Sequence, residues 1–208
     1  MVILSSLVIG YLLGSVSFSY LIGKMIRKID IREYGSGNAG ATNTLRVLGT
    51  GPAIVVLILD VLKGVAAVLI SQALGGEEWI PVLAGLFAIV GHNWPLFSGF
   101  RGGKGVATTI GVFVTIAPFP ALIAGGIAIL LIILTRFVSL GSLAFVTLTP
   151  FVMLLFFDYP LVYFYIALII VILSYWKHRS NISKLLQGNE NKIGEKTKIH
   201  ESSRSIRK

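Results

Sequence analysis

Seven long apolar stretches divide the sequence, and short polar segments separate them. The stretches cover residues 2–23, 52–74, 79–97, 105–118, 119–135, 137–157 and 160–176. A helix needs about 20 apolar residues to cross the ~30 Å hydrocarbon core of a bilayer, and most of these stretches approach or exceed that length. The first one has neither the basic start nor the cleavage site of a signal peptide. We therefore predict an all-α membrane protein, a polytopic helical bundle with seven transmembrane helices.

The stretches 105–118 and 119–135 allow two interpretations. The first is short, and Pro118 and Pro120 lie at its junction with the second. Two full crossings and a single re-entrant hairpin would both return the chain to the side on which it entered. The topology of the other helices is therefore the same in either case.

The charges between the apolar stretches predict the orientation of the bundle. Of the 18 Lys and Arg residues, 17 lie in 24–51, 98–104, at position 136 or after residue 176, which all fall on one side. The opposite side carries only Glu77, Glu78 and Asp158. Because Lys and Arg accumulate in cytoplasmic loops, we expect the N-terminus outside and the C-terminus in the cytoplasm.

The composition excludes several classes of protein. The chain has 208 residues, of which 55% are hydrophobic and only 13% charged, with a net charge of +9. Soluble domains have about 25% charged residues, so the positive charge does not indicate a soluble nucleic-acid-binding protein. The absence of cysteine excludes a disulfide scaffold and a cysteine nucleophile. We expect a single transmembrane catalytic domain over 1–190 and a basic polar cytoplasmic tail over 191–208.

Three polar segments interrupt the hydrophobic pattern, and all three fall on the predicted cytoplasmic side. They cover residues 35–49, 91–105 and 178–190, and are called here the first, second and third polar segments. The first contains a GxGxxG pattern, but a dinucleotide fingerprint requires a βαβ unit that an apolar helix cannot supply. The second resembles a phosphate loop at Gly103-Lys104, but Ser98 and Gly105 stand where a Walker A motif needs Gly and Ser or Thr.

The first two segments nevertheless share the chemistry of a phosphate site. Glycines let backbone N–H groups approach an anion, and a helix that starts after them adds its positive end. Arg46, Arg101 and Lys104 can contribute charge. Alternatively, the glycines only form tight loops and the basic residues only follow the orientation rule. Two such segments on one side favour a phosphate-bearing ligand.

His92 and His178 are the residues of these segments that can transfer protons near neutral pH. His178 and Asn181 are three positions apart, so on a helix they share a face. We expect no metal, because there is no HExxH motif and Glu190 is the only acidic residue of the three segments. Asp60 and Lys63 share a helix face within an apolar stretch, where charge is costly. They are interpreted either as a structural ion pair or as support for the site.

The three polar segments resemble, in order, the three motifs of the bacterial integral-membrane acyl-phosphate:glycerol-3-phosphate acyltransferases, the PlsY family. The motifs read GSGNAGATNTLRVLG, GHNWPLFSGFRGGKGVATT and HRSNISKLLQGNE and cover about a quarter of the chain. Lys184 stands where many members carry Arg, which preserves the charge. The resemblance implies transfer of a fatty acyl group from acyl phosphate to the 1-position of glycerol 3-phosphate. Its products are lysophosphatidic acid and inorganic phosphate, used in phospholipid biosynthesis.

The resemblance also implies roles for individual residues. The expected catalytic residues are Ser36, Arg46, Lys104, His178 and Asn181, with Glu190 as structural support. The expected substrate-binding residues are Gly37, Asn38, Gly40, Thr42, Asn43, His92, Asn93, Arg101, Gly102 and Gly103. We expect a monomer in the bacterial inner (cytoplasmic) membrane that contacts membrane lipid, has its active site at the cytoplasmic face and has no nucleic-acid partner.

The chemistry of an acyl phosphate agrees with these residues. It is an activated mixed anhydride, so no cofactor, metal or acyl-enzyme is expected, and positioning can supply much of the rate. The proton of the attacking hydroxyl goes either to His178 or to a phosphate oxygen of the donor. No histidine starts the HxxxxD pattern of acyl-CoA-dependent acyltransferases, which favours the acyl-phosphate donor. A transporter of an organic phosphate would instead need paired polar breaks near the bilayer midplane.

Overall fold

The computed structural model describes residues 1–194, and the secondary structure of this part is entirely helical. The α-helices are α1 (Val2–Gly14), α2 (Phe18–Arg27), α3 (Ala41–Leu48), α4 (Thr50–Leu74), α5 (Ile80–Asn93), α6 (Val106–Ile116), α7 (Pro118–Thr135), α8 (Val138–Phe156), α9 (Leu161–Lys177) and α10 (Arg179–Leu186). Two 3₁₀ turns, η1 (Ile31–Glu33) and η2 (Leu96–Ser98), lie in the loops. The predicted all-α class is confirmed. The division at residue 190 stays a prediction, because most of the tail lies outside the described residues.

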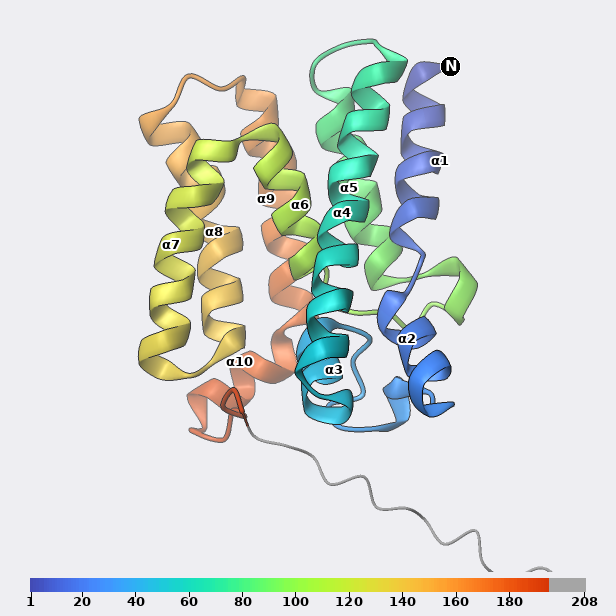
Figure 1. Ribbon diagram of the computed structural model, residues 1–208. Coiled ribbons are helices and arrows are strands. Elements are labelled where there is room, and N and C mark those ends of the chain that lie inside the picture. The colour runs from blue at the N-terminus through green and yellow to red at the C-terminus, as the bar shows by residue number, and fades with distance from the viewer. Residues whose placement is uncertain (195–208) are drawn as a thin grey trace, which may run out of the picture.

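The long helices run alongside one another along one axis (Figure 1). Helix α1 packs on α4 and α5, α4 packs on α6, and α8 packs between α7 and α9. The apolar core lies where these groups meet, and its largest fully buried side chains are Phe113, Ile89 and Ile170. The core therefore joins the α1–α4–α5 group to the α7–α8–α9 group through the short helix α6.

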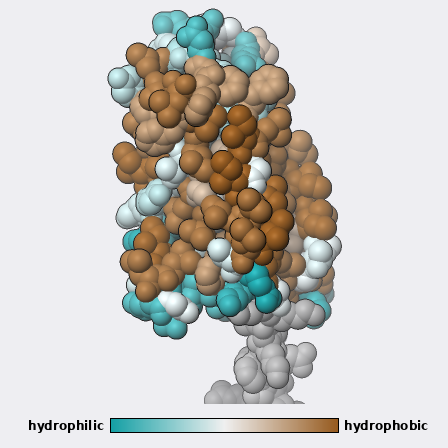
Figure 2. Space-filling model, turned by 90° about the vertical axis from the view of Figure 1, so that its left-hand side faces the viewer, coloured by the Kyte–Doolittle hydropathy of each residue, from teal (hydrophilic) through white to brown (hydrophobic). Residues whose placement is uncertain are grey.

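The outer surface of the bundle is suited to lipid. Figure 2 shows apolar side chains over the middle of one face and polar side chains gathered at the two ends. On α7, Leu122, Ile129, Ile133 and Leu134 are each more than half exposed. Such a surface has no partner in water but matches the hydrocarbon core of a bilayer. The membrane-embedded character predicted from the sequence is thus supported by the packing.

Seven full crossings are not confirmed. Within residues 1–194, five spans are long and apolar enough to cross a bilayer, and α9 with α10 gives a sixth if this pair, bent by 62°, is counted as one. Helix α6 has 11 residues, which at 1.5 Å per residue covers about 17 Å, little more than half of the hydrocarbon core. It begins midway along the bundle and turns back into α7 at Pro118 (Figure 1). The chain thus returns to its starting end, as both interpretations of 105–135 required.

The first apolar stretch is interrupted, which the sequence pattern did not predict. Helix α1 ends at Gly14 and α2 begins at Phe18. The carbonyl of Val16 in this break accepts a hydrogen bond from Lys63 Nζ at 2.8 Å. A buried ammonium needs such acceptors, so the break exposes a carbonyl that a continuous helix would have used.

The three polar segments converge at one end of the bundle. Helices α2, α3 and α10 and their loops lie at the end opposite the N-terminus (Figure 1). This arrangement agrees with the predicted topology, although which end faces the cytoplasm stays a prediction.

Candidate active site

The first polar segment is folded around the side chain of Asn43. Its Oδ1 accepts a hydrogen bond from the Ser36 backbone N–H at 2.8 Å, and its Nδ2 donates to the carbonyls of Ile31 and Tyr34, both at 3.1 Å. Gly35 and Gly37 have φ angles of +62° and +72°, which glycine adopts without strain. Asn43 therefore closes the loop that leads into α3 and leaves the Ser36 side chain exposed.

The remaining predicted residues of this segment lie on or near α3. Gly40 is the residue before the helix, and its carbonyl accepts a hydrogen bond from Thr44 Oγ1 at 3.1 Å. Asn38 Oδ1 is buried without a hydrogen-bond partner in the structure. Thr42 and Arg46 are half-buried on α3. The segment thus offers an unused amide oxygen and a guanidinium beside a tight glycine turn.

The glycine-rich loop of the second segment is pressed against the end of α5. The N–H of Gly103 donates to the His92 carbonyl at 3.1 Å. A Cβ on Gly103 would overlap with His92 Nε2 and with the Ala39 carbonyl of the first segment. Gly102 is equally confined by the His92 carbonyl. Only glycines allow this contact, which brings the first and second segments together.

The third segment reaches the second through a chain of polar side chains. Lys104 Nζ donates to Asn181 Oδ1 at 2.5 Å, and Asn181 Nδ2 donates to Glu190 Oε1 at 2.7 Å. Ser139 Oγ on α8 donates to the same carboxylate oxygen at 2.9 Å. Glu190 is 8% exposed. It therefore orients Asn181, and Asn181 in turn holds the Lys104 ammonium.

Three further basic residues add positive charge around Lys104. Burial lowers the pKa of Lys104 to about 8; Glu190 opposes the shift, while Arg46, Lys184 and Lys177 add to it. We call Arg46, Lys104, Lys177 and Lys184 the cationic cluster. Among the described residues, Glu190 is the only acidic group that acts on the pKa of Lys104 in this way. An anion placed here would relieve repulsion and satisfy charged donors.

His178 lies between α9 and α10, where the chain bends. It is 2% exposed, and its Nδ1 lies 2.8 Å from the Ser174 carbonyl, which fixes Nδ1 as the protonated nitrogen. Burial, followed by the charge of Lys104, lowers the pKa of His178 to about 4. The imidazole is therefore neutral at pH 7 and a weak base.

The structure places the other predicted residues behind or beside the cluster. His92 and Asn93 are buried behind the glycine loop, and neither amide atom of the Asn93 side chain has a hydrogen-bond partner. Arg101 is exposed. The Asn43 side chain is fully engaged with backbone groups. Substrate contact by these four residues stays a prediction.

Arg32 is a residue of the site region that the sequence pattern counted only as a cytoplasmic charge. Its guanidinium pairs with Asp30 at 2.7 Å and donates to the carbonyls of Ser98 and Arg101 at 2.5 and 3.3 Å. Hydrogen bonding by the Arg32 side chain lowers the pKa of Asp30. The Asp30-x-Arg32 spacing was the available signal. Arg32 thus ties the loop before the first segment to the second segment.

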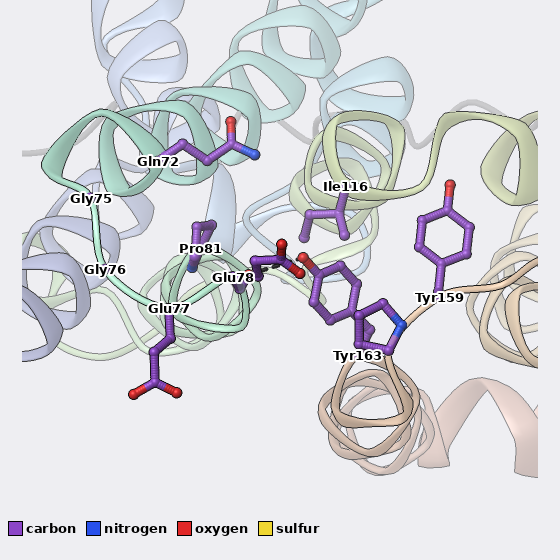
Figure 3. Close-up of a pocket in the computed structure, with 10 residues that line it drawn as sticks. Gln72, Gly75, Gly76, Glu77, Glu78, Pro81, Ile116, Tyr159 and Tyr163 are labelled. Carbon is purple, nitrogen blue, oxygen red and sulfur yellow. Dashed lines mark hydrogen bonds between the residues drawn. The ribbon is translucent and has the colours of Figure 1, made fainter.

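A recess at the opposite end of the bundle is separate from this site (Figure 3). It is lined by Gln72, Gly75, Gly76, Glu77, Glu78, Pro81, Ile116, Tyr159, Pro160 and Tyr163. Tyr163 Oη donates to the Glu78 carbonyl at 2.9 Å, and in Figure 3 the Glu77 side chain points away from the recess. The described residues also contain no cluster of His, Asp or Glu that could hold a metal ion.

Comparison with known proteins identifies the family. The profile described as "Glycerol-3-phosphate acyltransferase" matches residues 4–188. The chain belongs to the glycerol-3-phosphate acyltransferase family. A glycerol-3-phosphate acyltransferase of Shouchella clausii is 60% identical over 199 residues, covering 93% of this chain and 97% of the relative. One of Halalkalibacterium halodurans is 61% identical over 196 residues, covering 91% and 95%.

Two solved structures share the fold of this acyltransferase. The crystal structure of PlsY, an integral membrane glycerol 3-phosphate acyltransferase, in its glycerol 3-phosphate form has a TM-score of 0.87 and 37% identity. It covers 92% of this chain and 96% of its own. The lysophosphatidic acid form has a TM-score of 0.84 and 36% identity, covering 93% and 96%. The predicted resemblance is confirmed, and the protein is an acyltransferase of an integral-membrane family.

Proposed function

We propose that this protein transfers a fatty acyl group from acyl phosphate to the 1-position of glycerol 3-phosphate. The products are lysophosphatidic acid and inorganic phosphate, for phospholipid biosynthesis. The observation that carries the proposal is the cationic cluster, assembled from all three polar segments beside a glycine loop. It fits a reaction in which both substrates carry phosphate, and the related PlsY structures are of glycerol 3-phosphate and lysophosphatidic acid forms.

Arg46 and Lys104 are proposed to bind the substrate phosphates. Both belong to the cationic cluster, and Arg46 can present two parallel donors to phosphate oxygens. Ser36 and Asn38 lie in the adjoining loop, and Gly102 and Gly103 let the second segment pack closely against His92 beside them. Donors held in place before the substrate arrives stabilise the charge that develops on the leaving phosphate.

The transfer needs one displacement at the acyl carbon. The 1-hydroxyl oxygen of glycerol 3-phosphate attacks the carbonyl carbon, and the bond from that carbon to the phosphate oxygen breaks. The electron pair of this bond leaves with the phosphate, and the hydroxyl proton passes to a phosphate oxygen. The step balances without an acyl-enzyme, a metal or a cofactor, so the protein acts by positioning and by charge.

The donor phosphate is the proposed proton acceptor in preference to His178. A general base works best when its pKa lies near the working pH, whereas the pKa of His178 is lowered to about 4. Its Nδ1–H is held by the Ser174 carbonyl, so the ring has a fixed orientation. His178 is therefore proposed to orient substrate through the other ring nitrogen.

The reaction is proposed to take place at the cytoplasmic face of the bacterial inner membrane, in a monomer. The acyl chain would lie among the helices in contact with membrane lipid, while the polar substrate arrives from the aqueous side. The exposed apolar side chains over the middle of the face in Figure 2 support contact of the acyl chain with lipid. The convergence of the three segments at one end (Figure 1) supports entry of the polar substrate from the aqueous side.

The test uses the purified full chain in lipid nanodiscs with acyl phosphate and glycerol 3-phosphate. We expect equimolar release of inorganic phosphate and lysophosphatidic acid, with no product when acyl-CoA replaces acyl phosphate. Product from acyl-CoA alone would overturn the choice of donor. In sealed proteoliposomes, uptake of labelled glycerol 3-phosphate without acylation would instead indicate a transporter.

A further inference from the structure

A buried charged cluster lies behind the glycine loop and is not used by the proposed chemistry. Asp60 Oδ1 lies 2.8 Å from Lys63 Nζ and 3.5 Å from His92 Nδ1. The three residues are 1%, 5% and 6% exposed. They come from α4 and α5, and both Asp60 oxygens lack a geometrically regular hydrogen bond.

Stability does not explain why charges are buried at this position. Removing an aspartate and a lysine from water costs several kcal/mol per ion, and apolar replacements of buried ion pairs are often as stable or more stable. Such a cluster is therefore expected to have a role other than stabilising the fold. Its contacts with the glycine loop indicate that role.

The cluster connects the helix core to the glycine loop through His92. The imidazole presents Nδ1 to Asp60 and Nε2 to Gly103, where even a Cβ would not fit. The His92 carbonyl also receives the Gly103 N–H. Lys63 extends the connection to the break between α1 and α2 through the Val16 carbonyl. A shift of the His92 ring would therefore be transmitted directly to the backbone that precedes Lys104.

We propose that Asp60 and Lys63 are positioning residues for the anion site, acting through His92. The Asp60 carboxylate, with Oδ1 3.5 Å from His92 Nδ1, keeps that side of the ring facing α4 by charge rather than by a regular hydrogen bond. This orientation fixes the place of Gly102 and Gly103 for phosphate binding. Neither Asp60 nor Lys63 contacts substrate. The identification of the anion as a substrate phosphate rests on the proposed function, whereas the existence of an anion site does not.

Inorganic phosphate is the probe, because its binding is measured without turnover. The wild-type thermal unfolding midpoint should rise with phosphate concentration, since a ligand of the folded state stabilises it. The paired variant Asp60→Asn with Lys63→Met removes both charges. We expect it to need about tenfold more phosphate for the same rise, the size expected for a weakened charge-assisted contact. The KM for at least one phosphate substrate should increase similarly.

Ser71→Ala is the matched control. Ser71 is also buried on α4, and its hydroxyl donates to Ser6 on α1 at 3.0 Å, in the half of the bundle away from the glycine loop. This variant should lower the unfolding midpoint and leave the phosphate dependence unchanged. A purely structural role for Asp60 and Lys63 predicts the same behaviour for the paired variant, and that result would overturn the proposal.

His92→Asn tests the positioning role independently, so the proposal can be checked even when the paired variant does not fold. The shorter amide keeps a polar group on the side of Asp60 but has no atom at the position of Nε2, so the contact with Gly103 is lost. We expect the same tenfold weakening of phosphate binding, and wild-type phosphate dependence would refute the proposal. An inactive wild-type enzyme that still shows the expected phosphate shifts would contradict the proposed function and leave the positioning role intact.

Discussion

The protonation of Lys104 should control the alkaline side of the pH profile. Burial lowers the pKa of Lys104 to about 8, so the ammonium is about 90% charged at pH 7 and about 10% charged at pH 9. The charged form binds phosphate, and it is lost as the pH rises through this pKa. We therefore expect kcat/KM, which reports the free enzyme, to fall about tenfold between pH 7 and pH 9.

Lys104→Arg provides the matched comparison. The guanidinium stays charged throughout this range. The fall in kcat/KM near pH 8, called here the descending limb of the pH profile, should therefore be absent in this variant, whatever its absolute rate. Titration of Lys104 does not cause this loss of activity by unfolding the protein. Its pKa is lower in the folded state than the unfolded value of 10.5, so its deprotonation makes the folded state more stable as the pH rises between these two values. Phosphate release measured from pH 6.5 to 9.5 tests this. A wild-type profile that is flat from pH 7 to 9, or an unchanged limb in Lys104→Arg, refutes the reasoning.

Three further predictions concern the other parts of the site and the topology. Arg46→Ala should stay folded and lose about ten- to a hundredfold in kcat/KM for loss of a charge-assisted contact; wild-type kinetics from the folded variant would count against the shared anion site. His178→Gln should keep activity within about tenfold of wild type, because hydrogen bonding is retained and general-base catalysis, worth roughly 10²–10⁴-fold, is not lost; a folded, substrate-binding but inactive variant would make His178 the base. In this cysteine-free chain, Glu77→Cys should react with an impermeant maleimide only from outside the cell, and reaction only from the cytoplasmic side would reverse the topology.

The helices were predictable because lipid imposes a simple requirement on sequence. Every backbone group in the hydrocarbon must be bonded within its own helix, so uncharged runs mark helices, and Pro118 marks the turn between α6 and α7. The break after Gly14 left no such mark, because Ser15, Val16 and Ser17 are compatible with an apolar helix. Within it, the Val16 carbonyl accepts a hydrogen bond from Lys63, 47 residues away, and hydropathy does not record such a contact.

The three polar segments that meet at the candidate site were predictable from composition, whereas the contacts made by their individual residues were not. Glycine, asparagine and basic residues stand out in apolar surroundings, so the three segments could be identified directly. Asn43 and Asn181 have the same chemistry in sequence, yet one is engaged with backbone groups and the other holds Lys104. Arg32 cannot be told from the other basic residues between the apolar stretches by its sequence context, and its contacts with Asp30, Ser98 and Arg101 distinguish it in the structure. These differences arise from tertiary contacts.

The amide of Asn181 explains how Lys104 is oriented without being neutralised. An ammonium paired directly with a carboxylate has its charge satisfied, and an arriving phosphate would have to displace that partner. In the part of the chain that the structure describes, Glu190 contacts Asn181 and Ser139, and Lys104 meets the amide oxygen instead. The carboxylate fixes the amide with its oxygen toward Lys104, because only the NH₂ end can donate to Glu190. A neutral acceptor therefore holds the ammonium in place while most of its charge remains for the substrate.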